Sequence, residues 1–190
     1  MRPQGTRPTI SARWQAWSGD GLEHLVLLED EDGARADSFV IGQADGGAFA
    51  ARYSVVCIKE WRTRAVSVTL AGQSQGIQIS SDGAGSWRDG GGNPLPELDG
   101  AIDVDITATP FTNTLPIRRL VLAAGQSAEI TVAYIDVPAL TVTADPQLYT
   151  CLEPTRRYRF ESQGGDFVRE IEVDEHGLVV LYPGLFKRVL

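Results

Sequence analysis

Three aspartates lie close together near the middle of the chain: Asp99, Asp103 and Asp105. Residues two apart in an extended strand face the same side about 7 Å apart, so Asp103 and Asp105 would present two neighbouring carboxylates. Such a pair can act as general acid and base, or it can ligate a divalent cation. It can also be a solvated strand face or be neutralised by arginine. The glycine and terminal glutamate of a calcium loop are missing here, so we expect neither a metal site nor a catalytic site.

Four arginines lie on two segments that could reach these aspartates: Arg62, Arg64, Arg118 and Arg119. Arg62 and Arg64 directly follow Trp61 and would share one face of a strand. A guanidinium group binds a carboxylate or a phosphate through two parallel hydrogen bonds. We predict that at least one arginine pairs with Asp103 or Asp105 in a partly buried network. At the end of a cavity, the same network would receive a sugar or phosphate head group.

Motifs for nucleophilic catalysis and for nucleotide binding are missing from the sequence. Its one GxSxG match, at 72–76, joins two predicted strands and is not the strand-to-helix elbow that a nucleophilic serine needs. It contains no GxGxxG segment, and its glycine-rich stretch near position 91 lacks the Lys-Ser/Thr of a phosphate-binding loop. The two cysteines, Cys57 and Cys151, do not have the spacing of a metal-binding pair, and neither do the two histidines. We expect both cysteines to be reduced and buried, and we expect no cofactor.

Composition restricts the class of protein. The 190 residues are 43% hydrophobic and 22% charged, as in a soluble globular domain. Because 25 acidic residues outnumber 17 basic ones, binding to nucleic acid or to an anionic lipid surface is disfavoured. The first residues lack the apolar segment of a signal peptide, and no apolar run is long enough to be a transmembrane segment. We therefore expect a cytoplasmic protein with a flexible tail at 1–12 and a single domain at 13–190.

Short strands separated by turns fill the sequence. Val66, Val68 and Leu70 alternate with small or polar residues, which is the pattern of a half-buried strand. Further strand patterns lie at 25–28, 36–43, 53–58, 77–80, 102–107, 129–134, 157–160, 171–173 and 178–182. The best candidate for a short helix is 112–120. About a dozen strands joined by tight turns predict an all-β fold, an antiparallel curved β-roll or barrel-like sheet with little helix.

A weak internal repeat occurs at an offset of 92 residues. It aligns Thr63 with Thr155, Val68 with Phe160, Gly72 with Gly164, Ile79 with Ile171, Asp82 with Asp174, and Gly85 with Gly177. Each copy reads as strand, loop, strand, Asp-containing turn and strand. Chance similarity between two β-meanders is one explanation. Duplication is the other, and it predicts two internal halves at about 13–98 and 99–190, with equivalent turns at Asp82 and Asp174.

Several blocks of the sequence resemble one known family. The longest blocks are 98–105 and 110–120, and shorter ones lie at 61–64, 82–87, 147–149, 173–180 and 182–185. Together they resemble the bacterial putative glycolipid-binding family over most of the chain beyond Trp14. The resemblance implies an all-β roll and no established catalysis. Related sequences often have cysteine where this chain has Ala101, so a thiol role at that position does not carry over.

The sequence thus predicts a non-catalytic binding protein that holds an amphiphile, such as a glycolipid, in the concavity of a β-roll. Apolar side chains would receive the lipid chain, and polar side chains from two strips would converge on its head group. The candidate ligand-binding residues are Trp61, Arg62, Arg64, Asp103, Asp105, Asn113, Thr114, Arg118 and Tyr149. Two other interpretations stay open. One is a hydrolase that acts on a sugar or lipid ester through paired aspartates, and the other is a structural or interaction module without a small ligand.

Overall fold

Fourteen strands form one curved sheet in the computed structural model, which describes residues 9–44, 46–74, 76–162 and 165–190. The first seven are β1 (Thr9–Ala16), β2 (Leu22–Asp30), β3 (Gly33–Ala44), β4 (Gly47–Ile58), β5 (Arg62–Leu70), β6 (Gly76–Ser81) and β7 (Trp87–Asp89). The second seven are β8 (Asp103–Ile106), β9 (Ser127–Asp136), β10 (Thr141–Glu153), β11 (Arg157–Ser162), β12 (Val168–Val173), β13 (Val179–Tyr182) and β14 (Phe186–Arg188). The helical elements are α1 (Thr114–Leu120) and three 3-10 turns, η1 (Lys59–Trp61), η2 (Pro96–Leu98) and η3 (Phe111–Asn113).

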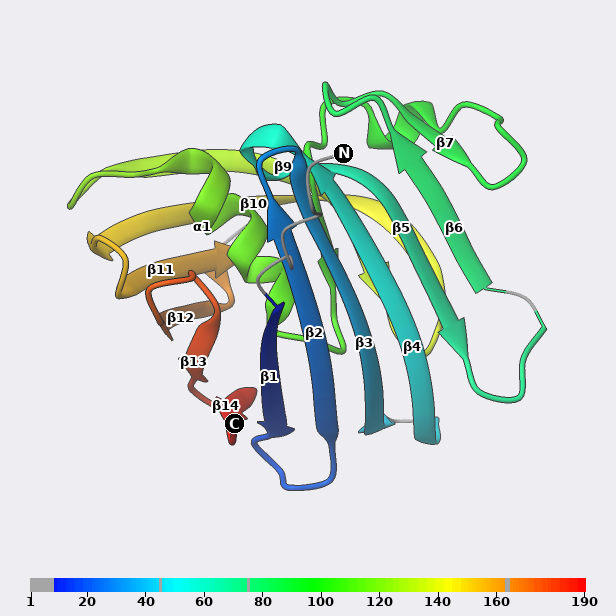
Figure 1. Ribbon diagram of the computed structural model, residues 1–190, viewed down its shortest axis with the longest axis horizontal. Coiled ribbons are helices and arrows are strands. Elements are labelled where there is room, and N and C mark those ends of the chain that lie inside the picture. Colours follow the sequence, from blue (N-terminus) through cyan, green and yellow to red (C-terminus); the bar gives the residue numbers. More distant parts are fainter. Residues whose placement is uncertain (1–8, 45, 75, 163–164) are drawn as a thin grey trace, which may run out of the picture.

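The strand order is β7-β6-β5-β4-β3-β2-β1-β14-β13-β12-β11-β10-β9-β8, and β8–β9 is the one parallel pair in this series. The sheet is not closed, because β7 and β8 are its edges. It curls far enough for the two ends to meet through backbone hydrogen bonds. Thr63 N donates to Ile102 O over 3.3 Å, and Gly100 N donates to Gly85 O over 2.9 Å. Figure 1 shows β2–β6 as one wall of the roll and β10–β13 as the other, with α1 between them.

Alternation along the strands decides which side chains fill the roll. In β2, Leu25 and Leu27 are fully buried, whereas Val26 between them is partly exposed. They belong to the larger apolar core, which also includes Val66 and Val68 of β5. A second core surrounds Phe160 in the wall built from β10 to β13. The predicted all-β roll with little helix is confirmed, as one large sheet that is mostly antiparallel.

Three strands differ from the sequence-based expectation. Residues 9–12, predicted as part of a flexible tail, begin β1, because Ile10 packs against the core and Ala12 is fully buried. Residues 1–8 lie outside the described residues. Strands β10 and β14 have few alternating apolar positions, and the sequence pattern does not predict them. Both are held by strand neighbours on each side, which no local pattern reveals.

The predicted short helix is present. Residues 111–113 form the turn η3, and 114–120 form α1. Pro116 lies in the first turn of α1, where a missing backbone N–H disrupts no helical hydrogen bond. The helix stops at Val121, which has the left-handed backbone conformation with φ 48°. A strand is disfavoured here, because proline cannot donate to a neighbouring strand.

The two segments of the internal repeat have the same local topology. Strands β5–β6–β7 and β11–β12–β13 are each three consecutive antiparallel strands. Asp82 Oδ1 accepts backbone hydrogen bonds from the residues two and four positions later, over 2.7 and 3.1 Å. Asp174 Oδ1 does the same over 2.9 and 3.0 Å. Gly85 and Gly177 both have positive φ, so the prediction of equivalent turns is confirmed. Gly164, aligned with Gly72, lies outside the described residues.

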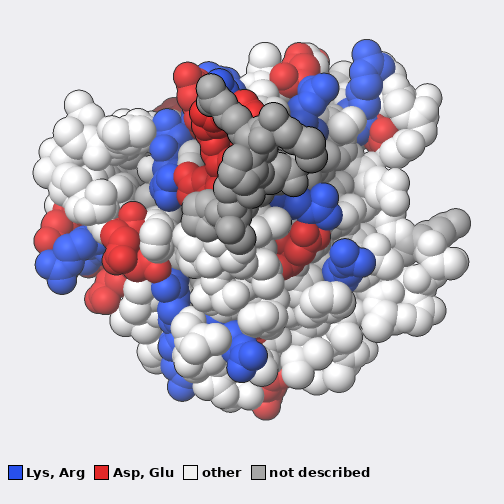
Figure 2. All heavy atoms as spheres, viewed as in Figure 1, with Lys and Arg blue, Asp and Glu red and all other residues white. Residues whose placement is uncertain are grey.

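Charged side chains are mixed on the surface. On the face shown in Figure 2, the described basic and acidic side chains are interspersed rather than gathered by sign. The described part of this face shows no continuous basic stripe of the kind with which proteins neutralise a nucleic-acid backbone. Inside the fold, Cys57 and Cys151 are both buried free thiols, as predicted.

Candidate functional site

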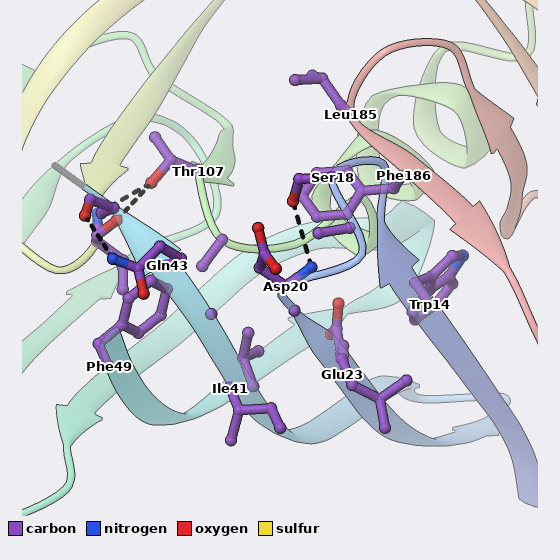
Figure 3. Close-up of a pocket in the computed structure, with 18 of the residues that line it drawn as sticks. Trp14, Ser18, Asp20, Glu23, Ile41, Gln43, Phe49, Thr107, Leu185 and Phe186 are labelled. Carbon is purple, nitrogen blue, oxygen red and sulfur yellow. Dashed lines mark hydrogen bonds between the residues drawn. The ribbon is translucent and has the colours of Figure 1, made fainter. Parts of the chain in front are cut away.

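Two cavities adjoin each other inside the roll. We call the first the Asp105 cavity, which has a volume of about 380 Å³ and is lined by Asp105, Asn113, Asp145, Gln147 and a group of aromatic rings. The second, the Glu23 cavity, has a volume of about 290 Å³ and is shown in Figure 3. Thr107, Leu185 and Phe186 line both cavities and form the wall between them. The roll therefore contains space, partly open to solvent, of the size that small-molecule sites use.

Polar groups gather at one end of the Asp105 cavity. Strand β8 positions Asp105, whose Oδ1 accepts a hydrogen bond from the Thr112 hydroxyl over 2.8 Å and whose Oδ2 accepts one from Gln147 Nε2 over 2.9 Å. Gln147 Nε2 also donates to Asp145 Oδ2 over 3.1 Å, so the amide links two carboxylates. Gln147 Oε1 is buried and has no hydrogen-bond partner. Burial raises the pKa of Asp105, and the hydrogen bonds from Gln147 and Thr112 oppose that rise.

Aromatic side chains form another part of the lining of this cavity. The ring centroid of Phe160 lies 6.0 Å from that of Phe167 and 6.4 Å from that of Tyr182. Phe186 from β14 completes this apolar wall. Behind it, the buried Tyr149 hydroxyl donates to Asn113 Oδ1 over 2.9 Å and fixes the orientation of that amide. The cavity thus combines a carboxylate-rich end with an aromatic surface, which is an amphipathic arrangement.

A different polar network lies in the Glu23 cavity. Glu23 Oε1 accepts three hydroxyl hydrogen bonds, from Ser38 over 2.8 Å, Tyr53 over 2.5 Å and Thr109 over 2.9 Å. Burial raises the pKa of Glu23 to about 7, although these three bonds favour the ionised form. Sequence reasoning missed Glu23. The available signal was its position in β2, two residues before Leu25 and therefore on the buried face.

Asp103 forms the predicted ion pair. Its carboxylate lies 2.6 Å from Arg119 Nη2 and also accepts from Arg119 Nε, so the contact is bidentate. The Asp103 side chain is fully buried and Arg119 is 14% exposed. The prediction that an arginine would pair with Asp103 or Asp105 is confirmed. This pair joins α1 to β8 and lines neither interior cavity.

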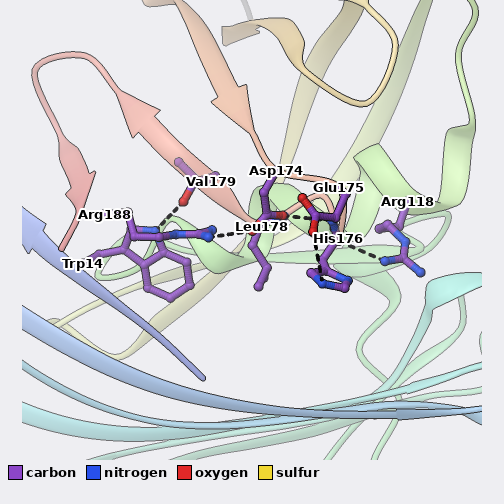
Figure 4. Close-up of polar contacts among 8 residues, drawn as sticks. All are labelled: Trp14, Arg118, Asp174, Glu175, His176, Leu178, Val179 and Arg188. Atoms are coloured by element: carbon purple, nitrogen blue, oxygen red, sulfur yellow. Dashed lines mark hydrogen bonds and ion pairs between the residues drawn. The ribbon is translucent and has the colours of Figure 1, made fainter. Parts of the chain in front are cut away.

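Arg118 forms a separate cluster on the other side of α1. Its guanidinium lies 4.5 Å from the centre of the Trp61 ring, 2.7 Å from Glu29 Oε1 and 2.9 Å from His176 O. Figure 4 shows Arg118 directed toward the turn that carries Asp174 and His176. The contacts join α1 to both halves of the sheet. Arg118 and Trp61 therefore connect α1 to the strands around it.

The nine predicted binding residues are therefore not gathered at one place. Asp105 and Asn113 line the Asp105 cavity. Arg62 donates to Gly83 O and Arg64 to Ser81 O, in the turn before β7. The remaining five, which line neither interior cavity, are Trp61, Asp103, Thr114, Arg118 and Tyr149. Gln147 and Asp145 were missed, although Gln147 is in phase with the buried Tyr149 along β10.

Comparisons with known proteins agree with the fold. The crystal structure of a DUF1089 family protein from Pseudomonas aeruginosa superposes with a TM-score of 0.80. It is 38% identical in sequence, and the match covers 90% of this chain and 92% of the other. No curated protein matches the chain. No helix in the described part of the chain is long and apolar enough to cross a membrane. The sequence pattern of one family, described as putative glycolipid-binding, matches residues 11–188, and the chain therefore belongs to the putative glycolipid-binding family.

Proposed function

We propose that the protein is a non-catalytic binding protein for an amphiphile of the glycolipid class, and that the Asp105 cavity is its site. The observation that carries this proposal is the buried Gln147 Oε1, which faces no hydrogen-bond donor of the protein. A buried acceptor without a partner is unfavourable unless a ligand or a water supplies the donor. Gln147 lines the cavity between two carboxylates, where a hydroxyl group of a bound molecule would supply that donor.

A sugar fits the polar end of the cavity. Asp105, Asp145 and Gln147 Oε1 all present acceptor oxygens, and sugar hydroxyls are donors that can satisfy several acceptors at once. The rings of Phe160, Phe167 and Tyr182 can contact an apolar chain or the C–H face of a sugar ring. A ligand with a hydroxyl-rich head and an apolar chain matches both parts.

The first experiment asks whether the purified protein carries such a molecule. Native mass spectrometry followed by organic extraction should reveal a co-purifying lipid. If the extract contains no lipid and the protein also fails to bind an added probe, the proposal is contradicted. The added probe is n-octyl β-glucoside below its micelle-forming concentration, titrated calorimetrically.

Variants then locate the probe. Gln147→Ala should weaken octyl glucoside binding by about tenfold, because one buried hydrogen-bonding group is removed. Asp37→Asn is the matched control: this carboxylate pairs with Arg35 on the surface and should leave binding unchanged. If both variants bind like the unmodified protein, the probe does not occupy the Asp105 cavity.

One observation favours a second candidate, a hydrolase acting on a sugar or lipid ester. Burial raises the pKa of Asp105, which a general acid requires, and Asp145 provides a second carboxylate linked through Gln147. Asp103 is not suited to this role, because Arg119 neutralises it outside both cavities. Turnover of a glycoside or ester that disappears in Asp105→Asn would establish the enzyme. If the substrate is unchanged after prolonged incubation, the protein is not this hydrolase and the non-catalytic binding function is retained.

A further inference from the structure

The Glu23 cavity contains a carboxyl group that the proposed function does not use. Glu23 is 2% exposed, and three hydroxyl groups donate to its Oε1. Its other oxygen, Oε2, is buried and has no hydrogen-bond partner. Figure 3 shows the Glu23 carboxyl group pointing from β2 into the pocket. Because Oε1 is already saturated, Oε2 is the oxygen left to meet a ligand.

The charge around this cavity is one-sided. Asp20 and Asp136 line it together with Glu23, and its described lining residues include no lysine, arginine or histidine. An anionic ligand would meet three carboxyl groups with no counter-charge. A cation would lower the electrostatic energy of the site and supply the partner that Oε2 lacks.

The walls favour an organic cation over a metal ion. Val40, Phe49, Val137 and Phe186 provide apolar surface around a volume of about 290 Å³. A hard cation such as Ca²⁺ needs six or more oxygen ligands. Among the described residues, no group of three or more histidine, cysteine, aspartate or glutamate side chains is arranged to hold a metal ion. Apolar walls next to a single unpartnered carboxylate oxygen match an amine with an apolar body.

We propose that the Glu23 cavity binds a small primary ammonium ion with a compact apolar body. The ammonium group donates to Glu23 Oε2, and the apolar body lies against Phe49 and Phe186. This site is separate from the Asp105 cavity, so it does not depend on the proposed glycolipid function. The wall of Thr107, Leu185 and Phe186 lies between the two ligands.

The test compares three probes of one shape: benzylamine, benzyl alcohol and benzoate. Each is titrated calorimetrically into the full-length protein at about pH 8, where benzylamine is protonated and Glu23 is ionised. Benzylammonium should bind about tenfold or more tightly than benzyl alcohol, because its hydrogen bond to Glu23 carries a charge. Benzoate should not bind measurably. The methyl resonances of Val40 and Val137 should shift on binding, which places the probe in this cavity.

Two variants separate this site from the other one. Glu23→Gln removes the charge and should weaken benzylammonium binding by about tenfold or more while leaving benzyl alcohol binding unchanged. Gln147 lies in the Asp105 cavity, so the Gln147→Ala variant should bind benzylammonium with the affinity of the unmodified protein. Equal affinities for benzylammonium and benzyl alcohol in the unmodified protein would overturn the proposal, and that comparison needs no variant to fold. Equal binding by folded Glu23→Gln would overturn it as well.

Discussion

The two halves of the sheet have matching strands at an offset of 92 residues, and they differ at two elements. At the offset of 92, residues 33–44, 47–58, 62–70, 76–81 and 87–89 correspond to β9, β10, β11, β12 and β13 within a few residues, and β1 corresponds to β8. Strand β14 is one exception, because the equivalent residues 94–96 form no strand. Strand β2 is the other: its residues 22–28 correspond to 114–120, which form α1. One half therefore has a central strand where the other has a helix.

This exchange explains the parallel pair. Strands β1 and β3 both pair antiparallel with β2, so they run in the same direction. When the middle strand is replaced by a helix, its two neighbours can pair directly and must then be parallel, as β8 and β9 are. Pro116 occupies the position of His24 in β2, where a backbone N–H would be needed. We infer that this proline and the helix that contains it account for the parallel pair.

The exchange also separates the two kinds of buried charge. Glu23 of β2 corresponds to Leu115 of α1, which is fully buried in the larger core. Arg119 of α1 corresponds to Leu27 of β2, which is also fully buried. The half with the strand therefore encloses a carboxyl group held by hydroxyls, and the half with the helix encloses an ion pair. Three measurements can break or sharpen this comparison.

The largest effect is expected at the ion pair that docks the helix. Asp103→Ala leaves Arg119 without its partner in a buried position and should lower the free energy of unfolding by about 3–5 kcal/mol. Chemical denaturation measures this change directly. Asp37→Ala, which breaks the exposed pair with Arg35, is the control and should cost no more than about 1 kcal/mol. Similar losses of unfolding free energy in the two variants would mean that the Asp103–Arg119 ion pair does not hold α1 in place.

The second effect is the pH dependence contributed by Glu23. Burial raises the pKa of Glu23 to about 7 in the folded state, above its ordinary value of 4.5. The folded state then holds this proton more tightly than the unfolded state, so stability falls as pH rises from about 4.5 to about 7. The loss reaches about 3 kcal/mol. The Glu23→Gln variant should lack this loss of stability. Unfolding curves at pH 5 and pH 8 for the variant and the unmodified protein measure the pH dependence of each. Parallel pH profiles would show that Glu23 does not titrate in this window.

The smallest effect distinguishes the two equivalent turns. Gly85 and Gly177 both have positive φ, so alanine strains either turn by roughly 1–3 kcal/mol. A Cβ at Gly85 would lie 2.9 Å from the backbone Cα of Gly100, whereas one at Gly177 would lie 3.0 Å from the side-chain Cδ of Arg118. A side chain can move aside more easily than backbone. Gly85→Ala should therefore lower the melting temperature more than Gly177→Ala does, and the reverse order would be inconsistent with this packing.

Local pattern accounts for much of the fold and little of the site. Alternating apolar residues identify most strands, and the pattern around Pro116 identifies the helix. The candidate site depends on contacts between distant residues. Thr109 bonds to Glu23 across 86 positions, and Gln147 bonds to Asp105 across 42. Alternation can show that a polar residue such as Glu23 faces inward. It cannot show whether that residue meets an arginine, a set of hydroxyls or an empty space.

The joint between the two halves of the sheet is the short pairing of β1 with β14. Strands β1 and β14 pair at three positions, whereas β3 and β4 pair at twelve. The residues at this joint include Ala16 and Phe186, which line the Glu23 cavity. In native-state fluctuations, short pairings open far more often than long ones without unfolding the rest. Amides of β14 should therefore exchange with deuterium faster than those of β3, and such openings would change the shape of the Glu23 cavity at Phe186 without unfolding the rest of the sheet.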